Sequence, residues 1–315
     1  MNKKLLNITQ EIRDIITEKQ KELELTFIED THTYYIKGKD GALTTGFPSV
    51  STVIGQFYTP FPDQEKSLEM SQGDLMEQDE LLTKWRATAD YANDQGSRVH
   101  YLLEHNLLEM YGGYKEVRVP IFDCGPQQTE DGDRMIKSGM DFIQVMHDRG
   151  AVLLDTEMVL GSVELGYTGQ PDKVWLMFDK QGNLGIVVTD WKTNKPKNFE
   201  VHHYTKDMLH PFSDHKDTAL AHYMIQLPLY ARLLLDMLKG SKYEDIKFLG
   251  CVIVHLEVDG KMTEYRIPKK FTDTVLTMDP LPRIEHVKEY KKLQEYKEES
   301  RLRKLDLMIH GYDGD

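Results

Sequence analysis

The sequence predicts an α/β domain built on a largely buried β-sheet. Segments 174–178 and 184–188 are almost wholly apolar, and segment 246–256 is mostly so. Strands of this kind are usually covered by helices on both faces. Helix-like patterns at 134–149 and 218–238 alternate with them along the chain. The 315 residues could form one elaborated domain or two smaller ones, and the lack of a Pro/Ser-rich linker favours one.

Helical and β-type periodicity predicts the remaining elements. Gly150 is expected to close the helix before the sheet as its C-terminal glycine. In chain order, we expect a helix at 4–23 packed on the body or on a partner chain, an antiparallel hairpin at 25–36, a Ser- or Thr-capped helix start at 48–54, an acidic solvated helix or loop at 63–80, a helix at 81–110 interrupted near 93–96, a long loop at 111–133, a helix at 134–149, strands at 152–160, 174–178 and 184–188, a polar segment at 193–217, a helix at 218–238, a strand at 246–256 and a solvated helix at 281–309.

Composition excludes several classes of protein. The chain has 39 basic and 52 acidic side chains, and this net charge of −13 argues against coating nucleic acid by bulk charge, although it allows a local basic groove. Only two cysteines occur, Cys124 and Cys251, so one chain cannot supply a four-cysteine zinc site or iron–sulfur cluster. The scarcity of cysteine and the absence of a signal-peptide pattern or membrane-length apolar run favour a reducing, cytoplasmic location.

One predicted hairpin brings two carboxylates level with each other. Its turn centres near Gln181, equally far along the chain from Asp172 and Asp190. Opposed side chains of an antiparallel pair have Cβ atoms about 4.5–5.5 Å apart, and two carboxylates that close repel. A divalent cation relieves this repulsion, and oxygen ligands suit Mg²⁺ or Mn²⁺. Alternation puts Lys192 on the face of Asp190. The charges could instead mark the solvated end of an ordinary hairpin.

The same residues resemble a known nuclease signature. Pro171-Asp172 followed by Asp190-Trp191-Lys192 is similar to the PD-(D/E)XK nuclease superfamily. Three further features resemble its RecB-like branch, which includes phage-encoded and mitochondrial genome-maintenance exonucleases. In the order of the family, they are Gly96-x-x-x-His100-x-x-x-Glu104, the acidic Glu157 and Gln226-x-x-x-Tyr230.

The resemblance covers roughly residues 96–230 and implies a restriction-endonuclease-like core, in which helices flank a central mixed β-sheet. It divides the chain into an N-terminal helix, hairpin and acidic segment at 1–80, a nuclease core at 81–280 and a C-terminal charged helix and tail at 281–315. The product it implies carries a 5′-phosphate, and the cofactor is Mg²⁺, for which Mn²⁺ substitutes, with no iron–sulfur cluster.

The resemblance also implies roles for individual residues. As metal ligands it gives His100, Glu157, Asp172, Asp190 and the main-chain carbonyl of Trp191. As catalytic residues it gives Asp172, Asp190, Lys192, Gln226 and Tyr230. Glu104 would orient His100, although Glu104 could be an ordinary surface acid of a helix and Glu157 an ordinary acid at a strand edge. Pro228 falls between Gln226 and Tyr230, so either the helix bends there or a new helix begins near Leu227.

A basic segment follows the proposed site directly. Partly charged histidines beside lysines could hold a phosphate backbone. The candidate DNA-binding residues are Lys195, Lys197, His202, His203 and Lys206. Phe199 and Tyr204 could stack on unpaired bases or could equally belong to the core. Five histidines between His202 and His222 fit no compact zinc spacing.

These observations favour a metal-dependent DNA nuclease. Among nucleases, they favour an exonuclease that acts on DNA ends or single strands. Its expected partners are DNA and phage or host recombination or replication proteins, with no membrane association. One alternative is a nucleic-acid-binding or recombination scaffold on the same fold with little or no catalysis. A third alternative is a hydrolase of small phosphate esters. The long polar segments and the basic run argue against it, because they suggest a polymeric substrate.

Overall fold

The computed structural model describes residues 3–111, 129–199 and 206–310. Its centre is a five-stranded mixed β-sheet with the strand order β10-β9-β8-β7-β4. Strands β8 and β9 are parallel, and all other neighbours are antiparallel. The strands are β4 (Val152–Thr156), β7 (Lys173–Phe178), β8 (Leu184–Lys192), β9 (Lys247–Leu256) and β10 (Met262–Arg266). The predicted α/β class, with helices around a mixed sheet, is confirmed.

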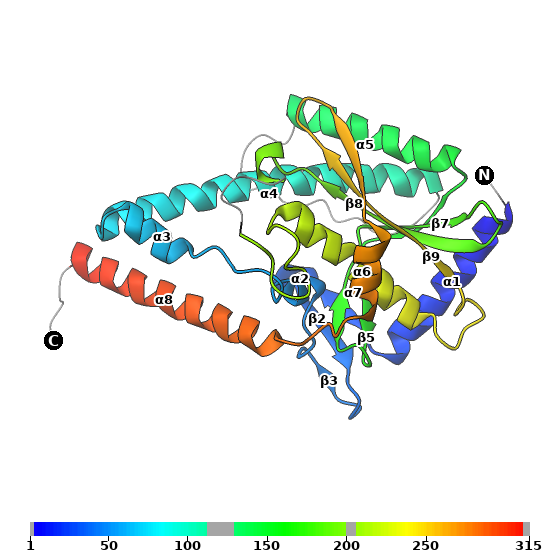
Figure 1. The fold of residues 1–315 in the computed structure, drawn as a ribbon, viewed down its shortest axis with the longest axis horizontal. Helices are drawn as coiled ribbons and strands as arrows, with labels where there is room; N and C mark the ends of the chain where they lie inside the picture. Colours follow the sequence, from blue (N-terminus) through cyan, green and yellow to red (C-terminus); the bar gives the residue numbers. More distant parts are fainter. Residues whose placement is uncertain (1–2, 112–128, 200–205, 311–315) are drawn as a thin grey trace.

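Helices cover both faces of this sheet (Figure 1). One face carries α4 (Leu75–Tyr111) and α5 (Glu130–Asp148), and the other carries α1 (Lys3–Glu22) and α6 (Ala219–Met237). Alternation along β8 sends Val187 and Trp191 into the apolar core under α4 and α5, and Ile186 and Val188 into the core under α6. Strands buried on both faces explain the nearly continuous apolar runs in the sequence.

Smaller elements surround this core. A three-stranded sheet joins β1 (Thr26–Ile28), β2 (Thr33–Lys37) and β3 (Leu43–Thr44), so the predicted hairpin gains a third strand. Ser49 caps α2 (Val50–Ile54) by accepting a hydrogen bond from Thr52 N, as the sequence predicted. The others are η1 (Glu29–Thr31), α3 (Asp63–Met70), β5 (Leu160–Ser162), β6 (Tyr167–Gly169), η2 (Pro196–Asn198), α7 (Lys269–Thr277) and α8 (Ile284–His310).

The expected interruption near residues 93–96 is wrong, because α4 runs unbroken through them for 37 residues. A glycine inside a helix usually costs about 1 kcal/mol relative to alanine. Here it permits a close approach: a Cβ atom on Gly96 would lie 3.1 Å from the hydroxyl of Thr193, which follows β8. Gly96 therefore lets α4 pass directly over the end of the central strand.

Helix α5 begins at Glu130, earlier than the predicted start at residue 134. Thr129 caps it by accepting a hydrogen bond from Gly132 N at 3.0 Å, a cap that periodicity alone did not reveal. Gly150 follows the helix with a φ of 78°, as expected for a C-terminal glycine. Most of the predicted loop at 111–133 lies outside the described residues. Strand β10 and helix α7 were not predicted.

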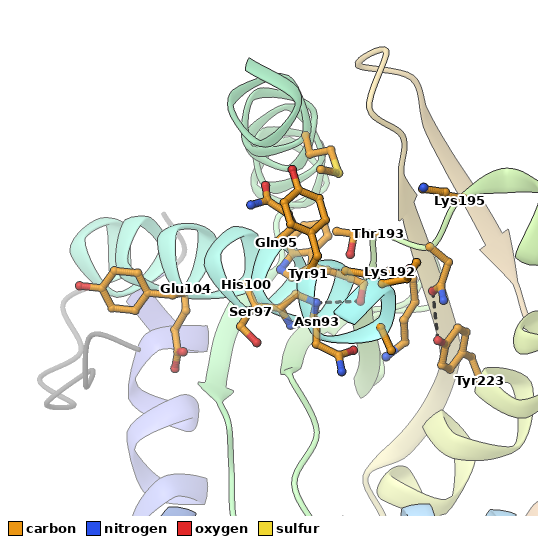
Figure 2. A pocket seen from close by; sticks show the side chains of 18 of the residues that line it. Tyr91, Asn93, Gln95, Ser97, His100, Glu104, Lys192, Thr193, Lys195 and Tyr223 are labelled. Carbon is orange, nitrogen blue, oxygen red and sulfur yellow. Dashed lines mark hydrogen bonds between the residues drawn. The ribbon is translucent and has the colours of Figure 1, made fainter. Parts of the chain in front are cut away.

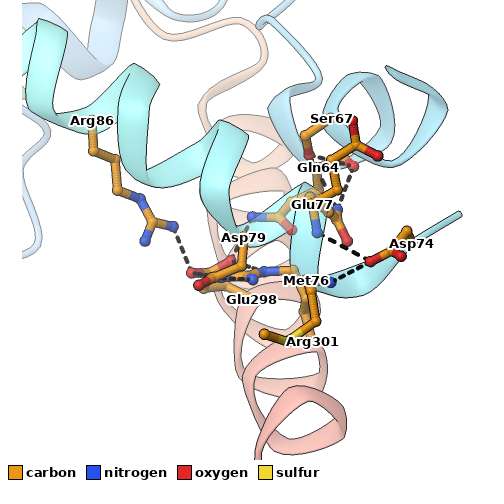
Figure 3. A network of polar contacts seen from close by, with 10 residues as sticks. Gln64, Ser67, Asp74, Met76, Glu77, Asp79, Arg86, Glu298 and Arg301 are labelled. Carbon is orange, nitrogen blue, oxygen red and sulfur yellow. Dashed lines mark hydrogen bonds and ion pairs between the residues drawn. The ribbon is translucent and has the colours of Figure 1, made fainter. Parts of the chain in front are cut away.

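Helix α8 is solvated as predicted, yet a polar network attaches it to α3 and α4 (Figure 3). The guanidinium of Arg301 is almost fully buried and pairs with Asp79 at 2.6 Å and Glu298 at 2.9 Å. Glu298 in turn contacts Arg86 and Gln64. In the parts of the chain that the structure describes, no helix combines the length and apolar character needed to cross a membrane.

Candidate functional site

Asp172 and Asp190 lie opposite each other where β7 begins and β8 ends. Lys173 pairs with Thr189 in the antiparallel register, so the next pair outward is Asp172 and Asp190. Asp172 Oδ2 also accepts a hydrogen bond from Trp191 N at 3.3 Å. The equal spacing of the two aspartates about the turn is therefore realised as a direct cross-strand pair.

Lys192 completes this group on the same face of the sheet. Asp190 and Lys192 follow Val188 in the strand alternation, so both side chains face α6. Asp190 is 2% exposed, and its Oδ2 lies 2.6 Å from Lys192 Nζ. The ammonium group also lies 4.2 Å from the centroid of the Tyr223 ring on α6. This cation–π contact holds the lysine at the border between the sheet and the solvent.

His100 and Glu157 approach the pair from two other elements. His100, on α4, places Nδ1 3.2 Å from Asp172 Oδ2 and donates from Nε2 to the carbonyl oxygen of Trp191 at 3.0 Å. Glu157 directly follows β4, and its main-chain N–H donates to the carbonyl oxygen of Asp172 at 3.0 Å. Candidate ligand atoms of His100, Glu157 and Asp172 all lie within 4.8 Å of one another.

The two buried carboxyl groups have opposite pKa shifts. Burial and the neighbouring Asp172 raise the pKa of Asp190 well above its usual value, and Lys192 offsets this only in part. Burial also opposes ionisation of Asp172, but Lys173, His100 and a hydrogen bond from Asp190 hold its pKa well below the usual value. Without a cation, Asp190 therefore keeps its proton to a higher pH than Asp172 does.

The lysine of the group stays charged. Burial alone would lower the pKa of Lys192, but Asp190 and Asp172 outweigh burial and raise it. A charged ammonium beside two carboxyl groups is the arrangement that can stabilise negative charge on a substrate.

Glu104 does not orient His100 as expected. Both imidazole nitrogens face other groups, and Glu104 Oε1 instead accepts a hydrogen bond from Thr156 Oγ1 at 2.6 Å. Thr156 is the last residue of β4, immediately before Glu157. Helical spacing correctly put Glu104 on the side of His100 but could not show which neighbour it contacts.

Gln226 and Tyr230 face the same region from α6, which is one helix from Ala219 to Met237 with Pro228 inside it. The alternative of a new helix near Leu227 is therefore wrong. Gln226 Nε2 donates to the Tyr230 hydroxyl at 3.0 Å, and Gln226 Oε1 is buried without a hydrogen-bond partner among the described residues. Burial, Asp190 and Asp172 raise the pKa of Tyr230, so its hydroxyl stays neutral.

A cleft of about 1600 Å³ opens over this group (Figure 2). The β1–β2 hairpin and the middle of α4 form its walls, and the end of β8 and the segment after it form its floor. His100, Glu157, Trp191 and Lys192 line the cleft, whereas the two aspartates do not. An ion or substrate in the cleft can therefore reach His100 and Lys192 directly.

The basic segment is only partly at the cleft. Lys195 and Lys197 are exposed and line it, whereas Lys206 is exposed but does not line it. His202, His203 and Tyr204 lie outside the described residues. Phe199 is fully buried and stacks on His255 with ring centroids 4.1 Å apart, so its ring cannot stack on a base.

Sequence reasoning missed three residues of this site. Lys173 is 1% exposed, with Nζ 3.6 Å from Asp172 Oδ2 and 4.8 Å from the Trp191 ring. A lysine at the start of an otherwise apolar strand was the signal that could have revealed it. Tyr34 from β2 and Tyr223 from α6 gave no such signal, because aromatic residues are common in cores.

The donors present fit a hard divalent cation. Carboxylate oxygens of Asp172 and Glu157, an imidazole nitrogen of His100 and a nearby main-chain carbonyl form a mixed oxygen and nitrogen set. Oxygen-rich sets of this kind suit Mg²⁺ and Mn²⁺. Asp190 joins them only if its contact with Lys192 loosens. No protein-family model matches the chain, and no curated protein matches it at a significant level.

Proposed function

We propose that this protein is a metal-dependent DNA nuclease with a restriction-endonuclease-like core, related to the RecB-like branch of the PD-(D/E)XK superfamily. In this proposal it acts on DNA ends or single strands, as an exonuclease, and leaves 5′-phosphates. The observation that carries the proposal is the opposed pair of Asp172 and Asp190, with Lys192 on the same face and a large cleft above.

Each side chain has a role that follows from its position. Asp172, Glu157, His100 and the Trp191 carbonyl would hold Mg²⁺ or Mn²⁺, joined by Asp190. When bound, the cation lowers the pKa of water and screens the negative phosphate. Lys192 lines the cleft, so its ammonium can contact a phosphate oxygen there and stabilise the charge that develops on it.

Gln226 and Tyr230 act as a second polar group beside the carboxylates. The neutral Tyr230 hydroxyl can donate a hydrogen bond, since Gln226 already donates to its oxygen. A Cβ atom on Gly169 would lie 2.7 Å from the Tyr230 ring, so glycine at this position lets the ring pack tightly below the site. The pair does not line the cleft, so in this proposal it acts from beneath, beside the buried carboxylates.

The direct test is cleavage of end-labelled single- and double-stranded DNA by the purified protein with Mg²⁺. We expect EDTA to abolish cleavage and Asp190→Asn to reduce it by at least about 100-fold, the scale of one essential electrostatic group. Asp306→Asn is the matched control, since Asp306 is a well-exposed acid on α8 far along the chain from the site. Full activity of Asp190→Asn would assign the cleavage to a contaminant and refute the proposal.

One observation favours the second candidate, a nucleic-acid-binding or recombination scaffold with little catalysis. Asp190 is buried and already paired with Lys192, so it does not face the cleft openly. Tight DNA binding that needs no divalent cation, with no turnover of any DNA, would support the scaffold over the nuclease.

A further inference from the structure

The β1–β2 hairpin presents an aromatic face to the cleft. Phe27, His32 and Tyr34 line the wall opposite α4. The rings of Phe27 and Tyr34 have centroids 4.6 Å apart and a 36° tilt, and His32 meets Phe27 edge-on at 5.7 Å. Phe27 and Tyr34 are only half-buried and His32 is exposed, so this face is not simply part of the apolar core.

This face lies next to the carboxylates. Tyr34 is close enough to Glu157 for that carboxylate to contribute to the raised pKa of Tyr34, second to burial. His32 and Glu157 also have φ angles of 48° and 44°, a left-handed backbone conformation that residues other than glycine rarely adopt. His32 adopts it as the residue that ends η1, and Glu157 as the residue that follows β4. Both residues line the same cleft.

Charge alone cannot hold a nucleic acid strongly in this cleft. Its walls carry Lys84, Lys195 and Lys197, but also Glu29 and Asp131. The whole chain carries a net charge of −13, which repels phosphate groups at long range. With Lys192, Glu104 and Glu157 included, lysines and acidic residues are equal in number in the lining, so charge gives the cleft no net attraction for phosphate and aromatic contacts can supply affinity.

Aromatic side chains supply such contacts only to bases whose faces are free. Stacking of bases on aromatic rings binds unpaired strands with little dependence on sequence, whereas the bases of a duplex already stack on one another. Across the cleft, Trp85, Tyr91 and Tyr101 of α4 line the opposite wall, and Tyr91 is 47% exposed. Figure 2 shows the Tyr91 side chain on the cleft side of α4, near Gln95 and Asn93.

We propose that Phe27, His32 and Tyr34, which we name the hairpin platform, bind an unpaired base of a single nucleic-acid strand and thereby deliver its backbone to Lys192 and His100. The proposal rests on the proposed nuclease function and deepens it. It specifies an unpaired strand as the ligand of the cleft and locates the base-binding surface on the N-terminal hairpin, outside the segment that carries the nuclease-like motifs.

The test measures binding of a fluorescent single-stranded oligothymidylate by anisotropy, with EDTA or with Ca²⁺ in place of Mg²⁺ so that the strand stays intact. We expect Phe27→Ala to raise Kd about 5- to 150-fold, the range that corresponds to one base–aromatic stack. Phe27→Tyr should bind like the wild type because it keeps the ring. Leu43→Ala is the matched control, since Leu43 is 52% exposed on β3 of the same small sheet but does not line the cleft.

An abasic strand of the same length separates stacking from backbone contacts. It should bind the wild type as weakly as oligothymidylate binds Phe27→Ala, and Phe27→Ala should not weaken it further. With the four lysines Lys84, Lys192, Lys195 and Lys197 lining the cleft, the logarithm of the binding constant should fall with that of salt concentration with a slope of about −3. Thermal melting of each variant checks the fold, and His32→Ala at the exposed tip replaces Phe27→Ala if the latter unfolds.

Three results would overturn the hairpin platform: unchanged affinity of Phe27→Ala and His32→Ala, equal affinity for the abasic strand, or no binding of single strands by the wild type. Failure of the proposed function is a separate outcome. Absence of Mg²⁺-dependent cleavage together with loss of binding in Phe27→Ala would refute the nuclease and leave the platform standing.

Discussion

Asp190→Asn tests the electrostatics of the site without any substrate. Asp190 is buried opposite Asp172, and its raised pKa means that the cation-free protein keeps a proton on it to a higher pH than on an ordinary aspartate. Asparagine has nearly the same shape and can donate a hydrogen bond to Asp172, as the protonated acid does, but it does not titrate. The variant should therefore resemble the protonated wild type at every pH.

The sign of the effect follows from the raised pKa. Stability that depends on protonated Asp190 is fully present below the usual aspartate pKa near 3.8 and is lost as pH rises through the raised value. Within that window the loss is at most about 1.4 kcal/mol per pH unit. For a chain of 315 residues this corresponds to about 2 °C in Tm per pH unit. Asp172, whose pKa is lowered, remains ionised above pH 5 and adds no slope.

The assay is thermal unfolding between pH 5 and 9 in EDTA for the wild type and Asp190→Asn. We expect the Tm of the wild type to fall relative to that of the variant as pH rises. Added Mn²⁺ should restore the wild type at high pH by replacing the proton, and should do so much less for the variant. Parallel curves for the two proteins across the whole range, with and without Mn²⁺, would refute the coupled-carboxylate reasoning.

Three further predictions concern neighbouring contacts. Tyr223→Leu, which removes the ring over Lys192, should slow DNA cleavage about 5- to 30-fold in the end-labelled assay, whereas Tyr223→Phe should stay within about twofold of the wild type. Lys173→Met, which leaves a buried carboxylate without its amine, should lower the urea-derived free energy of unfolding by about 3–5 kcal/mol. Arg301 lowers the pKa of Glu298 to about 2. The contribution of this ion pair to anchoring α8 is therefore present above pH 4.5 and is lost as pH falls toward 2. Limited proteolysis of α8 with an acid-active protease should detect this loss.

Each of these predictions has a result that would contradict it. Equal rates for the leucine and phenylalanine variants at position 223 would show that the ring does not position Lys192. An unchanged urea midpoint for Lys173→Met would show that its ion pair is not needed. Acid-dependent proteolysis of α8 that is the same in Glu298→Gln would place the sensitive group elsewhere.

The sequence was most informative where local geometry dictates spatial proximity. In a tight hairpin, sequence spacing fixes the register, so the meeting of Asp172 and Asp190 followed from their equal distance to the turn. Strand alternation likewise put Lys192 on their face. The two-faced burial of β8 could be predicted from its apolar run.

Contacts between distant segments could not be predicted from spacing. Nothing near Glu104 in the sequence shows that its carboxylate accepts a hydrogen bond from Thr156 and does not contact His100. Tyr34 reaches the cleft because the N-terminal hairpin forms part of its wall, and no periodicity in the sequence shows this. The unbroken course of α4 through Gly96 was also hidden, because its reason is the close approach of Thr193 from another element.

The length of α4 has a mechanical consequence. At about 1.5 Å per residue, its 37 residues form a rod about 55 Å long. Asp79 and Arg86 near one end hold α8, while His100, farther along, contacts Asp172 and the Trp191 carbonyl. Because the helix is continuous, an axial displacement at its attachment to α8 would also move His100. One unbroken helix thus connects the ion pairs that attach α8 with a side chain of the candidate site.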